Sequence, residues 1–304
     1  QKAYSFTCTD ADGNGICDAS LTHATNNVDF FPLAANVTCG SLDTADKTYG
    51  MSGALTATGT CFTVAANNIT LDCNGYTVTY ATSSAGSGID VSGYNATTVK
   101  NCIFLEQAAT TGSPAINVTR SNNSIFSNNT INTTGNYSYA IQIQRSNFTN
   151  ISSNTINTTG NLSYGLSTLN SARNNLTQNT VSTKGTSGDT YGINITTSPN
   201  SLLQSNTIKT GTTGTGANNY GIYLAGSNES NITGNTINTS GSGSNRGIYF
   251  NNSNSATVTS NTINTSGTST TNVGIYFFSS TSGTATSNTV RTSGTSSNFG
   301  IYFD

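Results

Sequence analysis

The segment DADGNGICD, residues 10–18, carries the side chains best suited to bind a metal ion. Its oxygen-bearing residues recur at nearly alternate positions: Asp10, Asp12, Asn14 and Asp18. Gly15 allows the sharp turn that such a loop needs, and Ile16 offers a main-chain carbonyl as a further ligand. Carboxylate, amide and carbonyl oxygens together fit one hard cation. The alternative interpretation is an Asp/Gly turn without a metal.

The six cysteines are a second source of chemistry, and they are Cys8, Cys17, Cys39, Cys61, Cys73 and Cys102. Because His23 is the only histidine, the cysteines favour disulfides in an oxidising compartment over a zinc site. Cys8 and Cys17 bracket the metal loop, and a bridge between them would close it. The other four leave three pairings open, and buried free thiols are the alternative.

Carboxylates are too scattered to predict a catalytic pair. Between residues 108 and 303 the only ones are Asp189 and Glu229, which lie at opposite ends of a repeated segment. Asp72 and Asp90 form the better pair, although the favoured interpretation is that both are turn-bonding aspartates. Glycoside hydrolysis needs two carboxyl groups about 5 to 9.5 Å apart. We therefore predict that the protein is not an enzyme.

Composition limits the remaining possibilities. The 304 residues are 33% hydrophobic and 7% charged, against about 45 to 50% and 25% in ordinary globular proteins. Asn, Thr, Ser and Gly fill the difference, which is typical of short strands joined by turns. A net charge of −2 without a Lys/Arg cluster argues against nucleic-acid binding, and no apolar run is long enough for a membrane span. The start at Gln1 predicts a mature, exported chain.

Two phrases recur along most of the sequence. Asn-Thr-Ile/Val begins at seven positions: Asn129, Asn154, Asn179, Asn206, Asn235, Asn261 and Asn288. Each is followed by a Gly-Ile-like phrase, and apolar residues alternate in both, as in Ile248-Tyr249-Phe250. Alternation of this kind predicts short strands. Three strands in each period of about 26 residues can superimpose if every period makes one coil of a solenoid with three parallel sheets.

These phrases resemble the right-handed parallel β-helix repeat of pectate-lyase-like enzymes, surface proteins and periplasmic NosD-like repeat proteins. The resemblance covers roughly residues 60–304. It implies an all-β, single-stranded right-handed parallel β-helix, and the Cys-rich leading segment is similar to archaeal-type surface proteins. This architecture hosts enzymes, adhesins and scaffolds alike.

The segment of residues 10–18 is similar to the calcium loops of EF-hands, dockerins and thrombospondin type 3 repeats. That resemblance implies Ca²⁺ as the cation, with Leu21 in place of the usual bidentate glutamate.

Two domains are expected: a Cys-rich N-terminal cap at residues 1–60 and the β-helix at residues 61–304. A cap would cover the open edges and core of the first coil. The recurrent asparagines from Asn129 to Asn288 are interpreted as an internal ladder of stacked amides at sharp bends. A polar binding stripe is the alternative.

About nineteen Asn-x-Ser/Thr sequons occur, and the selected candidates for N-linked glycans are Asn36, Asn95, Asn147, Asn161, Asn228 and Asn238. Since the chain holds about 43 asparagines, many sequons arise by chance. Some surface glycosylation is expected in a secreted protein.

Assembly is predicted from aromatic residues. Tyr223, Tyr249, Tyr276 and Tyr302 should point outward in the last coils, as a lateral contact or sugar-stacking platform, or merely as a stack that stabilises the sheet. The chain ends within a repeat, with Ile301 and Phe303 at the rim beside Tyr302. We expect head-to-tail docking of a second copy there; a longer chain or a frayed end are the alternatives.

The expected function is therefore structural, as an extracellular subunit of a cell-surface filament, fibre or layer. A glycan-binding adhesin is the first alternative, and a divergent polysaccharide lyase or hydrolase is the second.

Overall fold

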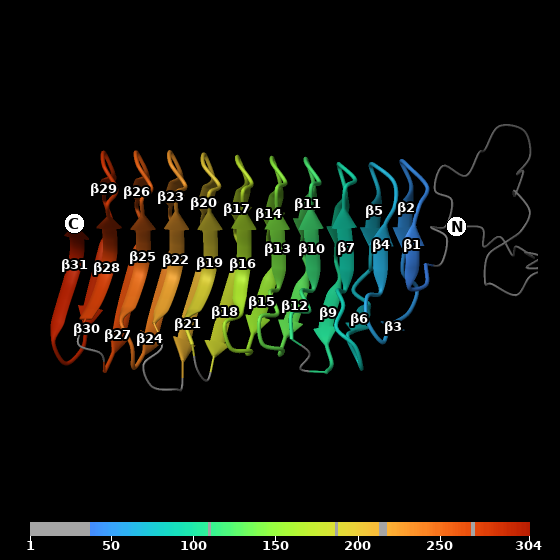
Figure 1. Cartoon of the computed structure of the whole chain (residues 1–304), viewed down its shortest axis with the longest axis horizontal. Helices are drawn as coiled ribbons and strands as arrows, with labels where there is room; N and C mark the ends of the chain where they lie inside the picture. The colour runs from blue at the N-terminus through green and yellow to red at the C-terminus, as the bar shows by residue number, and fades with distance from the viewer. Residues whose placement is uncertain (1–36, 109–110, 186–187, 213–217, 269–270) are drawn as a thin grey trace, which may run out of the picture.

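The computed structural model describes residues 37–108, 111–185, 188–212, 218–268 and 271–304. Within these ranges the chain forms parallel β-strands and no helix. Each coil contributes one strand to each of three sheets, so the coils stack into a rod with β1 near one end and β31 at the other (Figure 1). The predicted right-handed parallel β-helix is confirmed.

The three sheets run along the whole described rod. The first sheet comprises eleven strands, which are β1 (Gly40–Leu42), β4 (Phe62–Val64), β7 (Ile89–Ser92), β10 (Ile116–Thr119), β13 (Ile141–Gln144), β16 (Tyr164–Leu169), β19 (Thr190–Thr196), β22 (Asn219–Ala225), β25 (Asn245–Asn251), β28 (Thr271–Phe278) and β31 (Ser297–Phe303). The second sheet comprises ten short strands, which are β2 (Thr48–Gly50), β5 (Thr70–Asp72), β8 (Thr98–Lys100), β11 (Ile125–Ser127), β14 (Asn150–Ser152), β17 (Asn175–Thr177), β20 (Leu202–Gln204), β23 (Asn231–Thr233), β26 (Thr257–Thr259) and β29 (Thr284–Thr286). The third sheet comprises ten strands, which are β3 (Leu55–Thr56), β6 (Thr77–Tyr80), β9 (Ile103–Glu106), β12 (Thr130–Thr133), β15 (Thr155–Thr158), β18 (Thr180–Gly185), β21 (Thr207–Thr212), β24 (Thr236–Gly241), β27 (Thr262–Gly267) and β30 (Thr289–Ser293).

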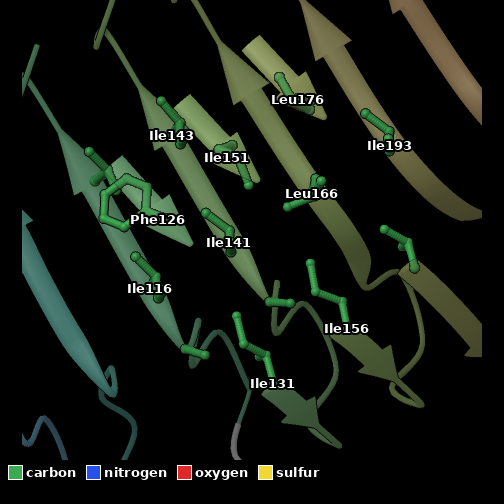
Figure 2. Close-up of a cluster of buried hydrophobic side chains, with 14 of the residues drawn as sticks. Ile116, Phe126, Ile131, Ile141, Ile143, Ile151, Ile156, Leu166, Leu176 and Ile193 are labelled. Carbon is green, nitrogen blue, oxygen red and sulfur yellow. The ribbon is translucent and has the colours of Figure 1, made fainter. Parts of the chain in front are cut away.

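The core is a narrow apolar column between the three sheets. Ile141 and Ile143 point inward from the first sheet, Ile151 from the second and Ile156 from the third (Figure 2). Equivalent residues lie on each other in successive coils, as in the pair Ile151 and Leu176. The coils repeat every 25 to 29 residues along the asparagine positions. The sequence phrases therefore repeat because each residue pairs with the equivalent residue of the next coil.

The glycine of the Gly-Ile phrase is required by close packing between sheets. A Cβ atom added to Gly221 would lie 2.3 Å from Cγ2 of Ile237 and 2.6 Å from the carbonyl oxygen of Gly247. The same collision recurs at Gly192, where Cγ2 of Ile208 lies 2.3 Å away. Any larger side chain would push the first sheet away from the third.

The solenoid begins earlier than expected. Strands β1, β2 and β3 pair in parallel with β4, β5 and β6, and Leu42 of β1 is fully buried. The predicted boundary between residues 60 and 61 therefore falls inside the β-helix. Its first coil was missed because it lacks the Asn-Thr-Ile phrase and because the paired Gly40 and Phe62 are closer in sequence than later pairs.

Candidate functional site

The recurrent asparagines form a continuous internal ladder. Nδ2 of Asn179 donates a hydrogen bond to Oδ1 of Asn206 at 3.0 Å and to the carbonyl of Ile151 at 2.8 Å. Its own Oδ1 accepts from Nδ2 of Asn154 at 3.0 Å. The side chains from Asn129 to Asn261 are at most 1% exposed. The ladder interpretation is therefore confirmed, and the binding-stripe alternative is wrong.

One detail of the ladder differs from expectation. The bend does not place the ladder asparagine in the left-handed region; the preceding residue adopts it, with φ of 56° at Gln178 and 55° at Ser205. The asparagine instead contributes its amide to the interior, where an unpaired polar group would be costly.

A second ladder of Asn219, Asn245, Asn272 and Asn298 was missed from the sequence. Their amides join at 2.8, 2.9 and 3.1 Å. The signal was an asparagine two residues before each Gly-Ile phrase of the last four coils.

Two disulfides connect consecutive coils at the N-terminal end of the rod. Cys39 pairs with Cys61 and Cys73 pairs with Cys102. This resolves the pairing that the sequence left open. Cys8 and Cys17 lie outside the described residues, as do the expected calcium ligands Asp10, Asp12, Asn14, Ile16 and Asp18. Calcium binding stays a prediction.

Asp72 takes part in a local polar network. Its carboxylate lies 3.2 Å from Nζ of Lys100 and accepts a hydrogen bond from Nδ2 of Asn101 at 2.9 Å. Partial burial works to raise the pKa of Asp72, but the bonds from Asn101, the N–H of Asn74 and Lys100 together hold that pKa below its ordinary value. Asp72 is therefore a structural anion rather than a proton donor.

The other carboxylates considered as catalytic are separated from Asp72. Asp90 lies on β7 of the first sheet, whereas Asp72 lies on β5 of the second, so the two face different sides of the rod. Oδ1 of Asp90 accepts a hydrogen bond from the hydroxyl of Ser92 at 2.6 Å. Asp189 accepts from the backbone N–H and Nδ2 of Asn218 at 3.0 and 3.1 Å. These bonds support the turn-bonding interpretation.

Glu106 is a buried carboxylate that the sequence did not reveal. Its Oε2 accepts from the N–H groups of Thr134 and Gly135 at 2.8 and 3.0 Å, and Oε1 accepts from the hydroxyl of Ser138 at 3.0 Å. It is 1% exposed. Three donors from the next coil satisfy the charge, which gives Glu106 a role in fixing that loop.

Eight tyrosines follow one another along the first sheet and are here named the tyrosine strip. Its members are Tyr139, Tyr164, Tyr191, Tyr220, Tyr223, Tyr249, Tyr276 and Tyr302. Ring centroids of Tyr191 and Tyr220 are 4.8 Å apart, and those of Tyr249 and Tyr276 are 5.0 Å apart, with interplanar angles of 18° and 19°. These two pairs lie face to face along the rod, whereas the rings of Tyr164 and Tyr191 meet edge to face at 69°.

The ridge predicted from Tyr223, Tyr249, Tyr276 and Tyr302 does point outward, and the same register positions in the three preceding coils hold Gln142, Ser167 and Asn194, as predicted. A second column of tyrosines, which ends at Tyr220 beside Tyr223, was missed. Tyr139 and the three tyrosines stacked after it extend the strip toward the N-terminus. The missed signal was a tyrosine immediately before the Ala-Ile, Gly-Leu or Gly-Ile phrase.

Arg246 occupies the middle of the strip. Its Nη1 donates to the hydroxyl of Tyr220 at 3.0 Å, and its guanidinium carbon lies 4.6 Å from the ring centroid of Tyr249 and 5.3 Å from that of Tyr276. Burial raises the pKa of Tyr220 to about 12, although Arg246 opposes this, and burial likewise raises the pKa of Tyr164 to about 12. The hydroxyls of Tyr164 and Tyr220 are therefore protonated at neutral pH.

The predicted glycosylation residues occupy two kinds of position. Asn95, Asn147, Asn161 and Asn228 lie in turns between strands, whereas Asn238 lies exposed on β24. Asn36 lies outside the described residues.

The residues predicted for end-to-end docking lie on β31. Ile301, Tyr302 and Phe303 are 42, 38 and 59% exposed. β31 pairs with β28, and the ring of Phe303 stacks on that of Phe277 at 4.7 Å. Docking of a second copy on this strand stays a prediction.

Comparison with known families agrees with this geometry. Residues 52–208, more than half of the chain, match the family model described as "Right handed beta helix region". The chain belongs to the right-handed β-helix family. Residues 179–299 of this β-helix also match a model described as "Periplasmic copper-binding protein (NosD)". Comparison with curated proteins gave no match.

Solved structures similar to this β-helix include three enzymes. Endopolygalacturonase I from Stereum purpureum is 13% identical, with 89% of this chain and 91% of that chain covered and a TM-score of 0.37. DFA-IIIase from Arthrobacter chlorophenolicus A6 is 10% identical, with 82% and 66% covered and a TM-score of 0.36. The periplasmic alginate epimerase AlgG is 13% identical, with 85% and 76% covered and a TM-score of 0.30. At these values the likeness concerns the fold alone.

Metal-ligating side chains are sparse in the described part of this β-helix. There, no three His, Cys, Asp or Glu residues gather in a way that could hold a metal ion. Nor does any helix in the same ranges have the length and apolar character to cross a bilayer.

Proposed function

We propose that this β-helix is a structural subunit of an assembly outside the cytoplasm, and that the tyrosine strip is its lateral contact with a second copy. The two disulfides support export, because such bonds persist in oxidising compartments. End-to-end contact through Ile301, Tyr302 and Phe303 would extend the same assembly into a filament.

The tyrosine strip is the observation that carries the proposal. Tyrosine and arginine are enriched in the well-packed centres of protein interfaces, and here Arg246 is surrounded by the rings of Tyr220, Tyr249 and Tyr276. Most of the stacked rings are half-buried and Tyr302 at the end of the rod is exposed, whereas Tyr220 is 7% exposed. Such a surface is rigid before binding, which reduces the entropy lost on association.

The interior supports a scaffold role. Every described coil is joined to the next by parallel sheet pairing, and the buried asparagine ladder adds side-chain bonds across seven coils. This continuous bonding along the axis favours a scaffold role.

The experiment compares assembly of the wild-type chain with that of the double variant Tyr249→Ser/Tyr276→Ser. Sedimentation velocity over a concentration series should show self-association of the wild type and at least a ten-fold weaker association of the variant. Tyr76→Ser/Tyr137→Ser is the matched control, because these tyrosines are 40 and 49% exposed but lie outside the strip. A wild type that stays monomeric, or a double variant that associates equally well, contradicts the proposal.

A glycan-binding surface is the second candidate, and Arg246 favours it. A guanidinium held between aromatic rings is suited to bind the carboxylate of an acidic sugar. Retention of the wild-type protein, but not of Arg246→Gln, on immobilised acidic polysaccharide would support this candidate.

Polysaccharide cleavage and copper binding have weaker support in this chain. Asp72 and Asp90, the best carboxylate pair from the sequence, lie on different sheets. The residues that the structure describes also do not offer a set of the imidazole, thiolate and thioether ligands that copper prefers. The single histidine is His23, outside the described part, and the four described cysteines are all in disulfides.

A further inference from the structure

The sequons of this chain differ in whether their hydroxyl can be reached. In seven of them the Ser or Thr is at most 1% exposed, and the residue between it and the asparagine has φ between 49° and 59°. These buried-hydroxyl sequons begin at Asn95, Asn122, Asn136, Asn147, Asn161, Asn228 and Asn251. The left-handed middle residue turns the chain so that the hydroxyl enters the solenoid.

These seven sequons have a structural explanation. Oδ1 of Asn95 accepts the backbone N–H of Asn122 in the next coil at 2.8 Å, and Oδ1 of Asn147 accepts that of Ala172 at 2.7 Å. The buried hydroxyl is small enough for the corner of the coil. A turn asparagine followed by an inward Ser or Thr therefore reproduces the sequon pattern for reasons of folding.

Three other sequons expose both the asparagine and the hydroxyl-bearing residue, whereas the remaining eight in the described ranges leave at least one of the two half-buried. The three exposed sequons are Asn128 with Thr130, Asn157 with Thr159, and Asn238 with Ser240. Residues two apart on a strand share a face, so Asn238 and Ser240 both point outward from β24 while Thr239 between them is 1% exposed. All three lie at or beside strands of the third sheet, namely β12, β15 and β24.

N-linked glycosylation requires access to both groups. The asparagine Nδ2 attacks the anomeric carbon of an oligosaccharide carried on a lipid pyrophosphate, and the bond from that carbon to the phosphate oxygen breaks. The lipid pyrophosphate leaves, and the amide proton passes to a base of the transferase. The transferase recognises the Ser or Thr hydroxyl as well as the asparagine. It therefore cannot bind a sequon whose hydroxyl lies inside the solenoid of the folded protein.

We propose that Asn128, Asn157 and Asn238 are the acceptor sites for N-linked glycans on the folded β-helix, and that the seven buried-hydroxyl sequons are not. The inference does not depend on the proposed assembly. It places glycans along the third sheet, whereas the tyrosine strip follows the first (Figure 1). Beside Asn238, a groove of about 290 Å³ lined also by Lys209 and Asn264 offers room for the first sugar.

The test uses the purified, disulfide-intact chain, a single-subunit oligosaccharyltransferase and a lipid-pyrophosphate-linked oligosaccharide. One sample stays folded and a matched sample is reduced and unfolded first. Site occupancy is measured by peptide mass spectrometry after enzymatic glycan release in heavy-oxygen water. In the folded sample we expect at least ten-fold higher occupancy at Asn128, Asn157 and Asn238 than at the buried-hydroxyl sequons, and unfolding should remove most of that difference.

Two variants make the test site-specific. Asn238→Gln should lose one glycan from the folded protein, whereas Asn228→Gln, in a buried-hydroxyl sequon, should leave its intact mass unchanged relative to the wild type. Modification of folded Asn228 as efficient as that of Asn238 overturns the proposal. So does the absence of modification at all three exposed sequons of the folded protein.

Discussion

Removal of the Asn206 side chain should open the solenoid locally, because Asn206 lies in the middle of the internal ladder. Its Oδ1 accepts from the N–H of Asn179 at 2.9 Å and from Nδ2 of the same residue at 3.0 Å. Its Nδ2 donates to the carbonyl of Leu176 at 2.8 Å and to Oδ1 of Asn235 at 2.9 Å. Asn206→Ala deletes all four bonds in a site that is 1% exposed.

The magnitude follows from the groups left without partners. A buried polar group that loses its partner costs roughly 1 to 3 kcal/mol, and the N–H of Asn179 and the carbonyl of Leu176 both lose one. The free energy of local opening should therefore fall by roughly 2 to 6 kcal/mol. The lower value corresponds to about a 30-fold faster amide exchange.

Hydrogen exchange is the appropriate assay, because stacked coils need not unfold as one cooperative unit. Exchange of the Asn179 amide should accelerate by at least this factor in Asn206→Ala, with smaller changes in distant coils. The matched control is Asn264→Ala, whose side chain is exposed on β27 and whose removal should change stability by no more than about 0.5 kcal/mol. Unchanged exchange at Asn179 would refute the energetic role assigned to the ladder.

Three more outcomes follow from the structure. Gly221→Ala should lower the free energy of unfolding by about 1 to 3 kcal/mol, because the added Cβ would lie 2.3 Å from Cγ2 of Ile237. The control is Gly53→Ala, where the added Cβ meets open space, and equal melting temperatures for the two variants would contradict the prediction. Burial raises the pKa of Tyr220 from 10 to about 12, so the stability conferred by its neutral hydroxyl is complete below about pH 10 and is lost as the pH rises toward 12. The melting temperature should fall over the same pH range in which tyrosinate absorbance rises, and a melting temperature that stays constant from pH 10 to pH 12 would contradict this prediction. Phe303→Asp should abolish end-to-end growth, because a charge would replace the exposed ring on β31; filaments seen by electron microscopy at wild-type length would exclude that contact.

The repeat phrases predicted the fold because each phrase occurs once in every coil. Period-two alternation determines which side of a strand a residue occupies, so Ile248 and Phe250 could be assigned to the interior and Tyr249 to the surface. The asparagine ladder was predictable for the same reason, since identical residues in register must contact one another.

The first coil and the disulfides could not be predicted in the same way. Cys39 and Cys61 are separated by 22 residues, and Cys73 and Cys102 by 29. Neither separation equals the 25 to 27 residues found in most later coils, so sequence spacing alone does not bring these cysteines together. Only the sheet register seen in the structure brings these cysteines together.

The sequence by itself determined the strands, their inward and outward faces and the stacking of equal phrases, because these depend on alternation and repetition within short segments. Tertiary structure decided which coil comes first, how Tyr220, Arg246 and Tyr249 meet on one surface, and which sequons hide their hydroxyls. The physical reason is that these arrangements depend on how one coil lies on the next, as where Arg246 meets Tyr220, 26 positions earlier in the chain. Their geometry is set by the length and bend of each coil, and the identity of the residues alone does not specify either.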